Sequence, residues 1–483
     1  MLLVIVAGPV WAWADTDRSH RSAPHARALA LPPASPGGVN IIYLPQIARS
    51  YIPGYVSPFG VAFYYNIDNA AGLAHMQAAG ARWASTYFRW AQIEPIPPVA
   101  DVPTYNWTEF DTKVANASAA GISLYAMFSW NPAWAAVYAG GPVTDTANLL
   151  AVAAAAAERY DGDGFQDAPG SPVVKYWAYY MEPDNYWPQA AAAGDRGLWG
   201  DDPEGYADML ASIANVVHAA NPQAVVLPGG VAYDAFGPPD GDGAFKRDFL
   251  GRVIERLNTK PGGATAYIGA VAFHYYPISP QYWSDIHEKT QEIRGILSAR
   301  GVGHLPLLVP EMGYWSVATT PPMPASSSPE QQARRLAQMY LHGLASGLVQ
   351  MDWFQIFDGQ CCSPLETHGL FFNGDLNTPK PSYYAYQALT QEMTGAYYVG
   401  PVNSPGIEGY VFSMWLEKTK WAVWATQPSA NMTFPLACVR RVDHLGNVAN
   451  PIVDNDAGWD QDSVLGQITL QVFENQTIYV EGC

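Results

Sequence analysis

The chain has 483 residues, of which 49% are hydrophobic and 14% charged, and its formal net charge is −18. This length and apolar content suffice for one large domain and a smaller one, which excludes a disordered or fibrous chain. An acidic protein repels phosphate backbones, so we expect no nucleic-acid partner. The 17 Trp and 29 Tyr suit stacking against sugar faces, or else they fill a large core.

Residues 1–14 predict a signal peptide and therefore a secreted protein. They read MLLVIVAGPVWAWA and end in an A-x-A cleavage pattern, although no basic residue precedes the apolar run. Residues 15–57 mix Ala, Pro, Ser, His and Arg without periodicity, which predicts a linker or N-terminal tail. No later stretch has the length and apolar content of a membrane span.

Strand-like and helix-like segments alternate from residue 58 to residue 394. Eight runs read as buried strands, at 59–65, 83–90, 123–130, 174–183, 224–231, 268–276, 306–314 and 349–358. Helical patterns such as 206–220 and 330–347 lie between them, and several end at a glycine. Eight such units favour a closed (β/α)₈ TIM barrel over an open doubly wound sheet, and no glycine fingerprint of a dinucleotide site follows the first strand.

Residues 395–483 change to short alternating runs, which predict a small C-terminal antiparallel β-sandwich domain. Such a module either covers the flank of the barrel or contacts a polymer. A disulfide between Cys438 and Cys483 would pin the chain end, whereas direct pairing of the adjacent Cys361 and Cys362 would be strained. No Cys/His spacing resembles a zinc site.

Two glutamates carry most of the functional information. Glu182 lies in VVKYWAYYMEPDNYW and Glu311 in LPLLVPEMGYW, each at the C-terminal tip of a predicted strand. Chemistry in (β/α)₈ barrels collects at these tips. Hydrolysis of a glycosidic bond needs one carboxylic acid to protonate the leaving oxygen and one carboxylate to attack or to activate water. The alternative is a pair of structural acids with satisfied hydrogen bonds.

The other strand tips are polar and aromatic, and they supply candidates for substrate binding. These candidates are Arg89, Trp130, Asn131, Asn185, His274, Tyr276 and Trp353. Each has an alternative structural explanation: Arg89 pairs with a barrel acid such as Glu94, His274 bonds within the core, and Trp353 packs the barrel.

A set of motifs makes residues 58–394 resemble the clan A glycoside hydrolases, nearest to families 39 and 5. The motifs are RWAQIEP, YWAYYMEPDN, AFHYYP, LLVPEMGYW, WFQIFD and GLFFNGDLNTPKPSYYAYQAL. The resemblance implies a retaining hydrolase of carbohydrate that requires no cofactor, with Glu182 as acid/base and Glu311 as nucleophile. It also implies that Arg89 orients the nucleophile, that the tip of the sixth strand hydrogen-bonds it, and that Trp353 is the platform under the cleaved sugar.

Met181 departs from this pattern, because the resemblance expects an asparagine whose amide binds the sugar 2-hydroxyl. A thioether cannot donate that hydrogen bond. Three explanations stay open: a sugar modified at C2, a substitute donor such as Asn185 or Asn131, or a barrel that binds carbohydrate with weak or no cleavage. We favour a competent enzyme with altered subsite contacts, and transglycosylation is a further alternative.

An acidic loop precedes the fourth predicted strand. It reads YDGDGFQD and places Asp161, Asp163 and Asp167 near glycines that permit sharp turns. Oxygen ligands at such spacing are typical of calcium loops, although no further bidentate acid is evident. The sequence therefore predicts a structural calcium ion here, or else a solvated acidic turn.

Overall fold

The computed structural model describes residues 57–138, 142–185, 199–233, 245–277, 285–317, 327–359, 367–372, 374–414 and 418–483. These residues all belong to one unit, Tyr43–Cys483. The predicted signal peptide, nearly all of the predicted tail, and Cys361 and Cys362 lie outside the described residues.

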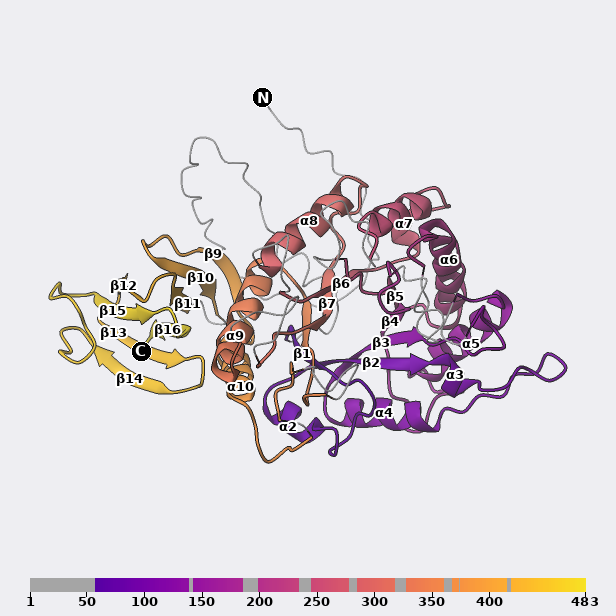
Figure 1. The fold of residues 1–483 in the computed structure, drawn as a ribbon, viewed down its shortest axis with the longest axis horizontal. Helices are drawn as coiled ribbons and strands as arrows, with labels where there is room; N and C mark the ends of the chain where they lie inside the picture. Colours follow the sequence, from indigo (N-terminus) through magenta and orange to yellow (C-terminus); the bar gives the residue numbers. More distant parts are fainter. Residues whose placement is uncertain are drawn as a thin grey trace, which may run out of the picture. The chain divides into compact units, whose positions relative to one another are not determined.

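Eight parallel strands form one sheet in the order β5-β4-β3-β2-β1-β8-β7-β6 (Figure 1). They are β1 (Phe59–Ala62), β2 (Trp83–Arg89), β3 (Ser123–Ser129), β4 (Tyr176–Tyr179), β5 (Val225–Pro228), β6 (Val271–Tyr275), β7 (Leu307–Met312) and β8 (Gln350–Trp353). The sheet closes between β5 and β6, where Val231 pairs with Phe273 and the His274 N–H donates to the Val231 carbonyl over 2.9 Å. The expected (β/α)₈ barrel is therefore confirmed, and each of the eight predicted runs contains a strand.

Helices follow the strands and pack around the sheet. They are α2 (Leu73–Ala78), α3 (Trp90–Ile93), α4 (Thr108–Ala119), α5 (Thr146–Arg159), α6 (Pro203–Ala220), α7 (Phe249–Asn258), α8 (Ile286–Ser298), α9 (Pro329–Ala345) and α10 (Pro381–Met393). Side chains of Asp145, Asp202, Asp285 and Ser328 accept backbone N–H groups at the starts of α5, α6, α8 and α9. These caps satisfy donors that a helix start leaves unpaired.

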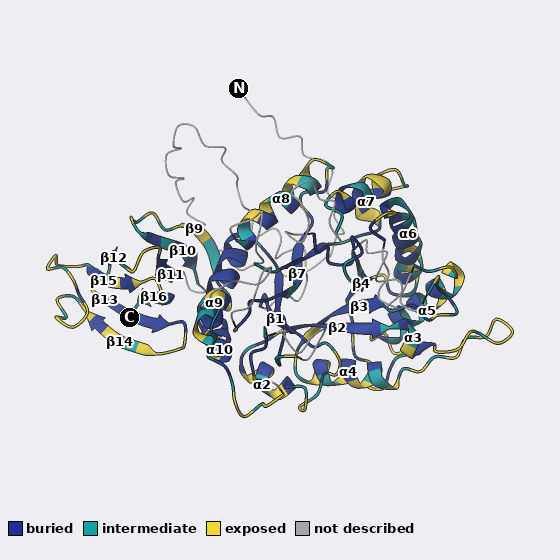
Figure 2. Cartoon of the chain, in the orientation of Figure 1, coloured by how far each residue is buried: buried dark blue, intermediate teal, exposed yellow. Residues whose placement is uncertain are grey.

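Side chains alternate between two apolar clusters along β2, β3 and β4. On β2, Trp83 and Tyr87 belong to the cluster inside the barrel, whereas Ala84 and Phe88 belong to the cluster between sheet and helices. Both faces of the sheet are therefore buried, as Figure 2 shows by the dark blue of the strands. This two-sided burial explains why the strands read as nearly continuous apolar runs.

One strand breaks the alternation, and the break positions a candidate site residue. Between Ala272 and His274 on β6 lies one residue, whereas their partners on β7, Leu308 and Glu311, are separated by two. The same irregularity recurs on the β8 side of β7. A β-bulge of this kind re-aims side chains, and the proline that lacks an N–H, Pro310, lies within it. Glu311 consequently comes into register with His274.

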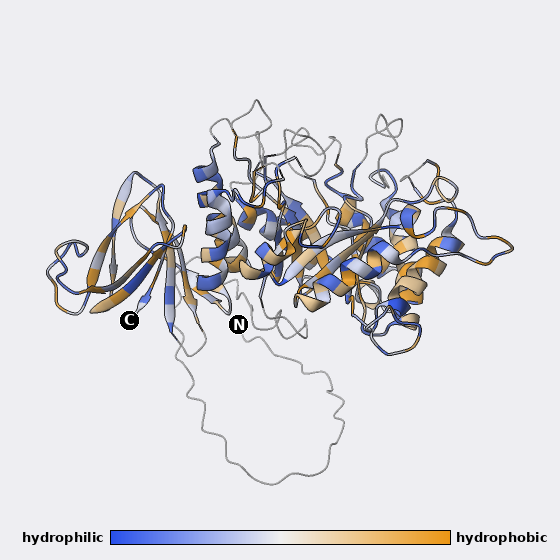
Figure 3. Cartoon of the chain, turned by 90° about the horizontal axis from the view of Figure 1, so that it is seen from below, coloured by the Kyte–Doolittle hydropathy of each residue, from blue (hydrophilic) through white to orange (hydrophobic). Residues whose placement is uncertain are grey.

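The C-terminal residues form antiparallel sheets, which confirms the predicted sandwich. The strands are β9 (Tyr397–Pro401), β10 (Ile407–Ser413), β11 (Thr419–Ala425), β12 (Ser429–Phe434), β13 (Cys438–Asp443), β14 (Val448–Val453), β15 (Ile468–Phe473) and β16 (Ile478–Gly482). Hydrophilic and hydrophobic residues mix along these strands (Figure 3). The run MTFPLACVR is divided into β12 and β13 around Pro435, which has no N–H for a ladder. A disulfide joins Cys438 to Cys483, with 5.5 Å between the Cα atoms.

Buried charges connect this module to the barrel helix α10. Glu392 of α10 lies 2.6 Å from Lys420 Nζ on β11 and 2.7 Å from Arg440 on β13. Glu481 of β16 completes the network, 3.2 Å from Lys420 and 3.1 Å from Arg440. The module therefore contacts the flank of the barrel through an ion-pair network. Among the described residues, no helix combines the length and apolar character needed to cross a membrane.

Candidate active site

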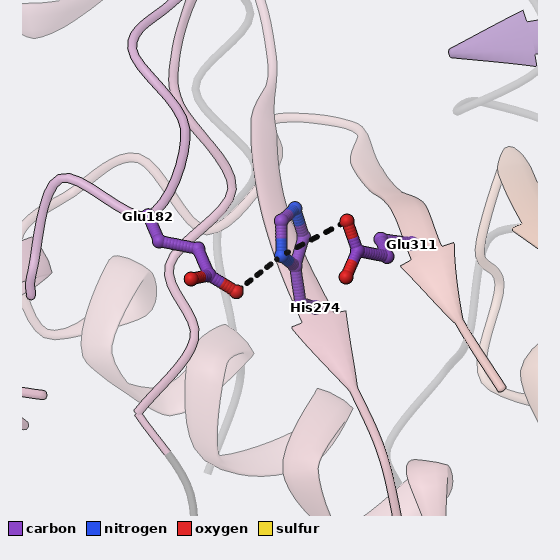
Figure 4. A group of neighbouring side chains, drawn as sticks. All are labelled: Glu182, His274 and Glu311. Carbon is purple, nitrogen blue, oxygen red and sulfur yellow. Dashed lines mark hydrogen bonds and ion pairs between the residues drawn. The ribbon is translucent and has the colours of Figure 1, made fainter. Parts of the chain in front are cut away.

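Glu182 and Glu311 meet at the mouth of the barrel, on either side of His274 (Figure 4). His274 Nδ1 lies 3.0 Å from Glu182 Oε1 and 3.9 Å from Glu311 Oε2. One carboxylate oxygen of each glutamate lies within 4.8 Å of the other. The two side chains retain 19% and 14% of their exposure, so solvent reaches both. Two partly exposed carboxyl groups thus share one small site.

Two left-handed residues turn the chain after β4 so that Glu182 faces this site. Tyr180 has φ +66° and Glu182 has φ +47°, a conformation that residues other than glycine adopt at a cost. Asp184 anchors the turn, because its buried carboxyl accepts the N–H groups of Ala232 (2.9 Å) and Tyr233 (2.8 Å). Burial raises the pKa of Asp184 to about 8. The loop after β5 therefore holds the loop that carries Glu182.

Glu311 is held from the tip of β6. The Tyr276 hydroxyl donates to Glu311 Oε1 over 2.6 Å, and His274 is the register partner of Glu311 across the sheet. A hydrogen bond to an ionised carboxylate is stronger than one between neutral groups. Tyr276 therefore fixes the orientation of Glu311 and favours its charged form.

His274 is a buried, neutral bridge between the carboxyl groups. Its side chain is 2% exposed, and burial lowers the pKa of His274. The ring lies against the backbone of Gly230, where an added Cβ would come within 2.5 Å of Nε2. Only glycine leaves room for the imidazole in this position.

Arg89 lies among aromatic rings at the tips of β1, β2 and β3. The centroids of Tyr65 and Trp130 are each 5.1 Å from its guanidinium carbon, and those of Tyr87 and Tyr64 are 5.5 and 5.7 Å away. A guanidinium over ring faces is stabilised by cation–π attraction. The structure therefore places Arg89 and Trp130 together, with Trp130 against the barrel interior.

The acid partners that the sequence suggested for Arg89 are not its contacts here. Within the part of the chain that the structure describes, no hydrogen bond or ion pair joins Arg89 to Glu311 or to Glu94. Glu94 instead accepts the indole N–H of Trp90 over 2.8 Å. Aromatic stacking, rather than a carboxylate, thus determines where Arg89 lies.

Met181 packs against the interior of the barrel and directly precedes Glu182. Its side chain packs against the interior cluster, and the Tyr87 hydroxyl hydrogen-bonds the Met181 sulfur. Burial raises the pKa of Tyr87, and the charges of Glu311 and Glu182 act in the same direction. The thioether thus lies in the mouth of the barrel, where the resemblance expects an amide.

The prediction that Trp353 forms a platform in the site is wrong. Trp353 is fully buried, stacks on Tyr340 of α9 with 6.5 Å between ring centroids, and donates its indole N–H to the His368 carbonyl. Residues on one strand alternate between faces, and Trp353 shares the helix-facing side with Met351. It is therefore a packing residue.

Asn131 and Asn185 each take part in a hydrogen bond within or to the loop that follows β4. Both are buried, with exposures of 1% and 4%. The Asn131 amide donates to the Tyr180 hydroxyl over 2.7 Å, and the Asn185 backbone N–H donates to the Glu182 carbonyl over 3.0 Å. Their predicted role as substitute donors to a sugar stays a prediction.

Several aromatic residues near the glutamates escaped the sequence analysis. Trp315, Phe354 and His368 surround the Tyr276 ring, with centroid distances of 5.9, 6.1 and 5.1 Å. The sequence carried a signal for the first, because Trp315 ends the run EMGYW that begins at Glu311. Phe354 had none, since it follows Trp353 in a run where periodicity gives no face.

Among the described residues, three groups of side chains have the types and spacing to hold a cation. In each, ligand atoms lie within 4.8 Å of one another: Glu182 with His274 and Glu311, Asp285 with His342 and Glu408, and Asp161 with Asp163 and Asp167. In the predicted calcium loop, carboxylates of Asp161, Asp163 and Asp167 also accept backbone N–H groups of the same loop. The calcium ion stays a prediction, because these bonds equally suit a solvated turn.

Solved structures share this architecture at low sequence identity. A family 39 glycoside hydrolase from Bacteroides cellulosilyticus is 18% identical with a TM-score of 0.63, covering 88% of this chain and 81% of its own. A glucosidase from Croceicoccus marinus (14%, TM-score 0.61) and a monomeric β-xylosidase from Caulobacter crescentus (14%, TM-score 0.58) each cover 88% of this chain and 96% of their own. The chain has the fold of these enzymes.

For the fold, this likeness confirms the resemblance to clan A barrels that the sequence motifs indicated. No family model and no curated protein sequence matches the chain. Because one barrel fold hosts many activities, the function has to be argued from the site.

Proposed function

We propose that the protein is a retaining glycoside hydrolase with Glu182 as general acid/base and Glu311 as nucleophile. The observation that carries the proposal is the approach of the two carboxylates to within 4.8 Å at a solvent-reachable barrel mouth. Retaining enzymes place their carboxyl groups about 5–5.5 Å apart, whereas inverting enzymes leave about 6.5–9.5 Å for a water molecule. The spacing supports double displacement through a covalent glycosyl-enzyme.

The contacts of each glutamate suit these roles. Glu311 attacks the anomeric carbon as a carboxylate, which the Tyr276 hydroxyl favours by donating to it. Glu182 then gives its proton to the departing glycosidic oxygen. In the second step Glu182 removes a proton from water, which attacks the anomeric carbon and frees Glu311.

His274 supports Glu182 in both protonation states. A neutral imidazole donates through Nδ1 to the ionised acid, or accepts there from the protonated acid, depending on its tautomer. Because burial lowers the pKa of His274, the ring adds no positive charge that would hold Glu182 permanently ionised. Glu182 thus keeps the freedom to exchange its proton.

A mechanism-based 2-fluoro sugar tests the proposal, because only a working nucleophile gains the covalent label. We expect mass spectrometry to show one label on a peptide containing Glu311, and no label in Glu311→Ala. Xylosides and glucosides with activated leaving groups are the first substrates to test, since a β-xylosidase and a glucosidase share the fold. Tyr276→Phe serves as a graded control that keeps the nucleophile and removes its hydrogen bond.

A carbohydrate-binding barrel without cleavage is the second candidate, and Met181 is the observation that favours it. Binding of a sugar without label or turnover in the wild type would select this candidate. Transfer of the glycosyl group to an added sugar acceptor, in preference to water, would identify a transglycosylase instead. Met181→Asn tests the position directly, because contact with the 2-hydroxyl predicts a changed kcat/KM.

We further propose that the protein is secreted and that it binds a structural calcium ion. Export would bring the enzyme to extracellular polysaccharide, and N-terminal sequencing of secreted protein would locate cleavage after residue 14. A structural calcium ion at Asp161, Asp163 and Asp167 would stiffen the loop before β4. An unchanged melting temperature with chelator and with added calcium would remove the ion from the proposal.

A further inference from the structure

We propose that the buried ion pair of Lys380 and Asp358 is a positioning pair for the nucleophile Glu311, acting through the rings that hold Tyr276. The proposal rests on the proposed function, because it assigns Glu311 a reaction to perform. The Lys380 ammonium hydrogen-bonds Asp358, Ser316 and Thr367, so we assign the pair an effect on Glu311 only through the segments that it orients.

The Lys380 ammonium ties together three segments around the site. Its Nζ lies 2.5 Å from Asp358 Oδ1 in the loop after β8 and 2.8 Å from Ser316 Oγ in the loop after β7. It also donates to the Thr367 carbonyl over 3.3 Å. Lys380 is fully buried and directly precedes α10, so the helix start delivers a charge to the junction of these loops.

Two of these segments carry the rings that surround Tyr276. Trp315 adjoins Ser316, His368 adjoins Thr367, and the Trp315 and His368 rings lie 4.4 Å apart. Backbone and side-chain bonds from Ser316 to the Thr367 carbonyl, both 3.0 Å, join the segments directly.

The two rings then contact Tyr276 at centroid distances of 5.9 and 5.1 Å, while its hydroxyl donates to Glu311 over 2.6 Å. A ring packed on one side by two fixed aromatic neighbours has few orientations left, so its hydroxyl stays aimed at the carboxylate. A shift of about 1 Å in a positioning group is enough to lower turnover about a hundredfold.

Burying the charge of a lysine costs free energy, so we expect Lys380 to have a role that an apolar side chain could not fill. Burial lowers the pKa of Lys380, and the neighbouring Asp358 carboxylate opposes that change. Buried ion pairs add little net stability compared with well-packed apolar residues. They do fix geometry, because each charge accepts only a few arrangements of its partners. Here that geometry is the meeting point of the loops that carry Trp315 and His368.

Lys380→Met tests the proposal, with Lys420→Met as a matched control. Both lysines are buried and paired with one main carboxylate, Asp358 or Glu392, but Lys420 lies on the C-terminal module. We expect Lys380→Met to lower kcat about tenfold, the effect of weakening one charged hydrogen bond, with KM within about twofold. Its acidic limb of kcat/KM against pH should move to higher pH, because the carboxylate loses a donor that favours ionisation.

Lys420→Met should lose stability but keep the kcat and pH profile of the wild type. Equal kinetic losses in the two variants, or an unchanged pH profile in Lys380→Met, would overturn the positioning role. If Lys380→Met does not fold, Ser316→Ala removes only one hydroxyl from the junction, and unchanged kinetics in that variant would likewise refute the proposal.

Measurements on the wild type alone test the proposed function, independently of the positioning variants. A wild type that neither cleaves glycosides nor gains the fluoro-sugar label would show that Glu311 is no nucleophile, before any positioning variant is compared.

Discussion

Removing the charge of Glu392 should strongly destabilise the protein, because this carboxylate is the centre of the buried network between α10 and the sandwich. Glu392 and Lys420 side chains are 7% and 5% exposed, and they approach to 2.6 Å. Breaking one partner of a buried pair costs about 3–5 kcal/mol. Glu481 remains near both Lys420 and Arg440 in Glu392→Gln. We therefore expect the lower end of that range, about 3 kcal/mol at pH 7.

The pH dependence of this loss provides an internal check. Burial opposes ionisation, yet Arg440 and Lys420 together lower the pKa of Glu392 below its ordinary 4.5. A lowered carboxyl pKa contributes stability that is complete above the unfolded value and is lost as the pH falls through the folded value. The difference between wild type and Glu392→Gln should accordingly shrink below about pH 4, where both side chains become neutral.

Urea unfolding, followed by fluorescence and circular dichroism together, measures the difference and tests for two-state behaviour. The matched control is Glu204→Gln, which breaks a bidentate pair with Arg252 whose side chains are 45% and 42% exposed. Exposed pairs contribute about 0–1 kcal/mol. A cost for Glu392→Gln that is no larger than the control's, or one that persists in acid, would refute the argument from burial.

Three further substitutions address the site and the core. Gly230→Ala places a Cβ about 2.5 Å from the His274 ring and should displace that ring. Because the hydrogen bond between His274 and Glu182 is then lost, kcat/KM should fall about 10- to 100-fold. A wild-type kcat/KM in this variant would contradict the prediction. Cys438→Ser removes the disulfide to Cys483, which lies 45 residues away in the sequence. The free energy of unfolding measured by chemical denaturation should fall by about 4 kcal/mol. Burial raises the pKa of Asp352 to about 8, so the stability that this carboxyl contributes should be lost as the pH rises from about 4 to about 8. The melting temperature of the wild type should therefore fall relative to that of Asp352→Asn over this range, and parallel profiles would exclude this contribution.

Strand positions were predictable because the barrel buries both faces of its sheet. Each strand therefore appears as an apolar run that ends in polar residues, and Glu182 and Glu311 were recognisable at two such ends. Because these runs are continuously apolar, the sequence does not indicate which face of the sheet an individual side chain occupies. Trp353 and Phe354 are adjacent aromatic residues, and only the pairing of β8 with its neighbours shows that Trp353 turns toward the helices.

Contacts between distant strands were equally hidden from the sequence. The aromatic surroundings of Arg89 come from residues that follow β1 and β3, and no local pattern reports that these tips converge on one guanidinium. Likewise, the run MTFPLACVR belongs to two strands, β12 and β13, although only Pro435 interrupts it. Proline in such a run was the available signal.

Pro310 similarly interrupts regular pairing within β7, and the register of that strand decides which side chain faces the barrel mouth. If every residue of β7 took part in regular pairing, Glu311 would lie opposite Tyr275, whose side chain joins the helix layer, and Met312 would occupy the barrel mouth. A slip by one position would thus place a thioether where the Glu311 carboxylate now lies, without any change in the codons of Glu182 and Glu311. A one-codon insertion or deletion in this segment of β7 would therefore displace the Glu311 carboxylate as effectively as a substitution of Glu311 itself.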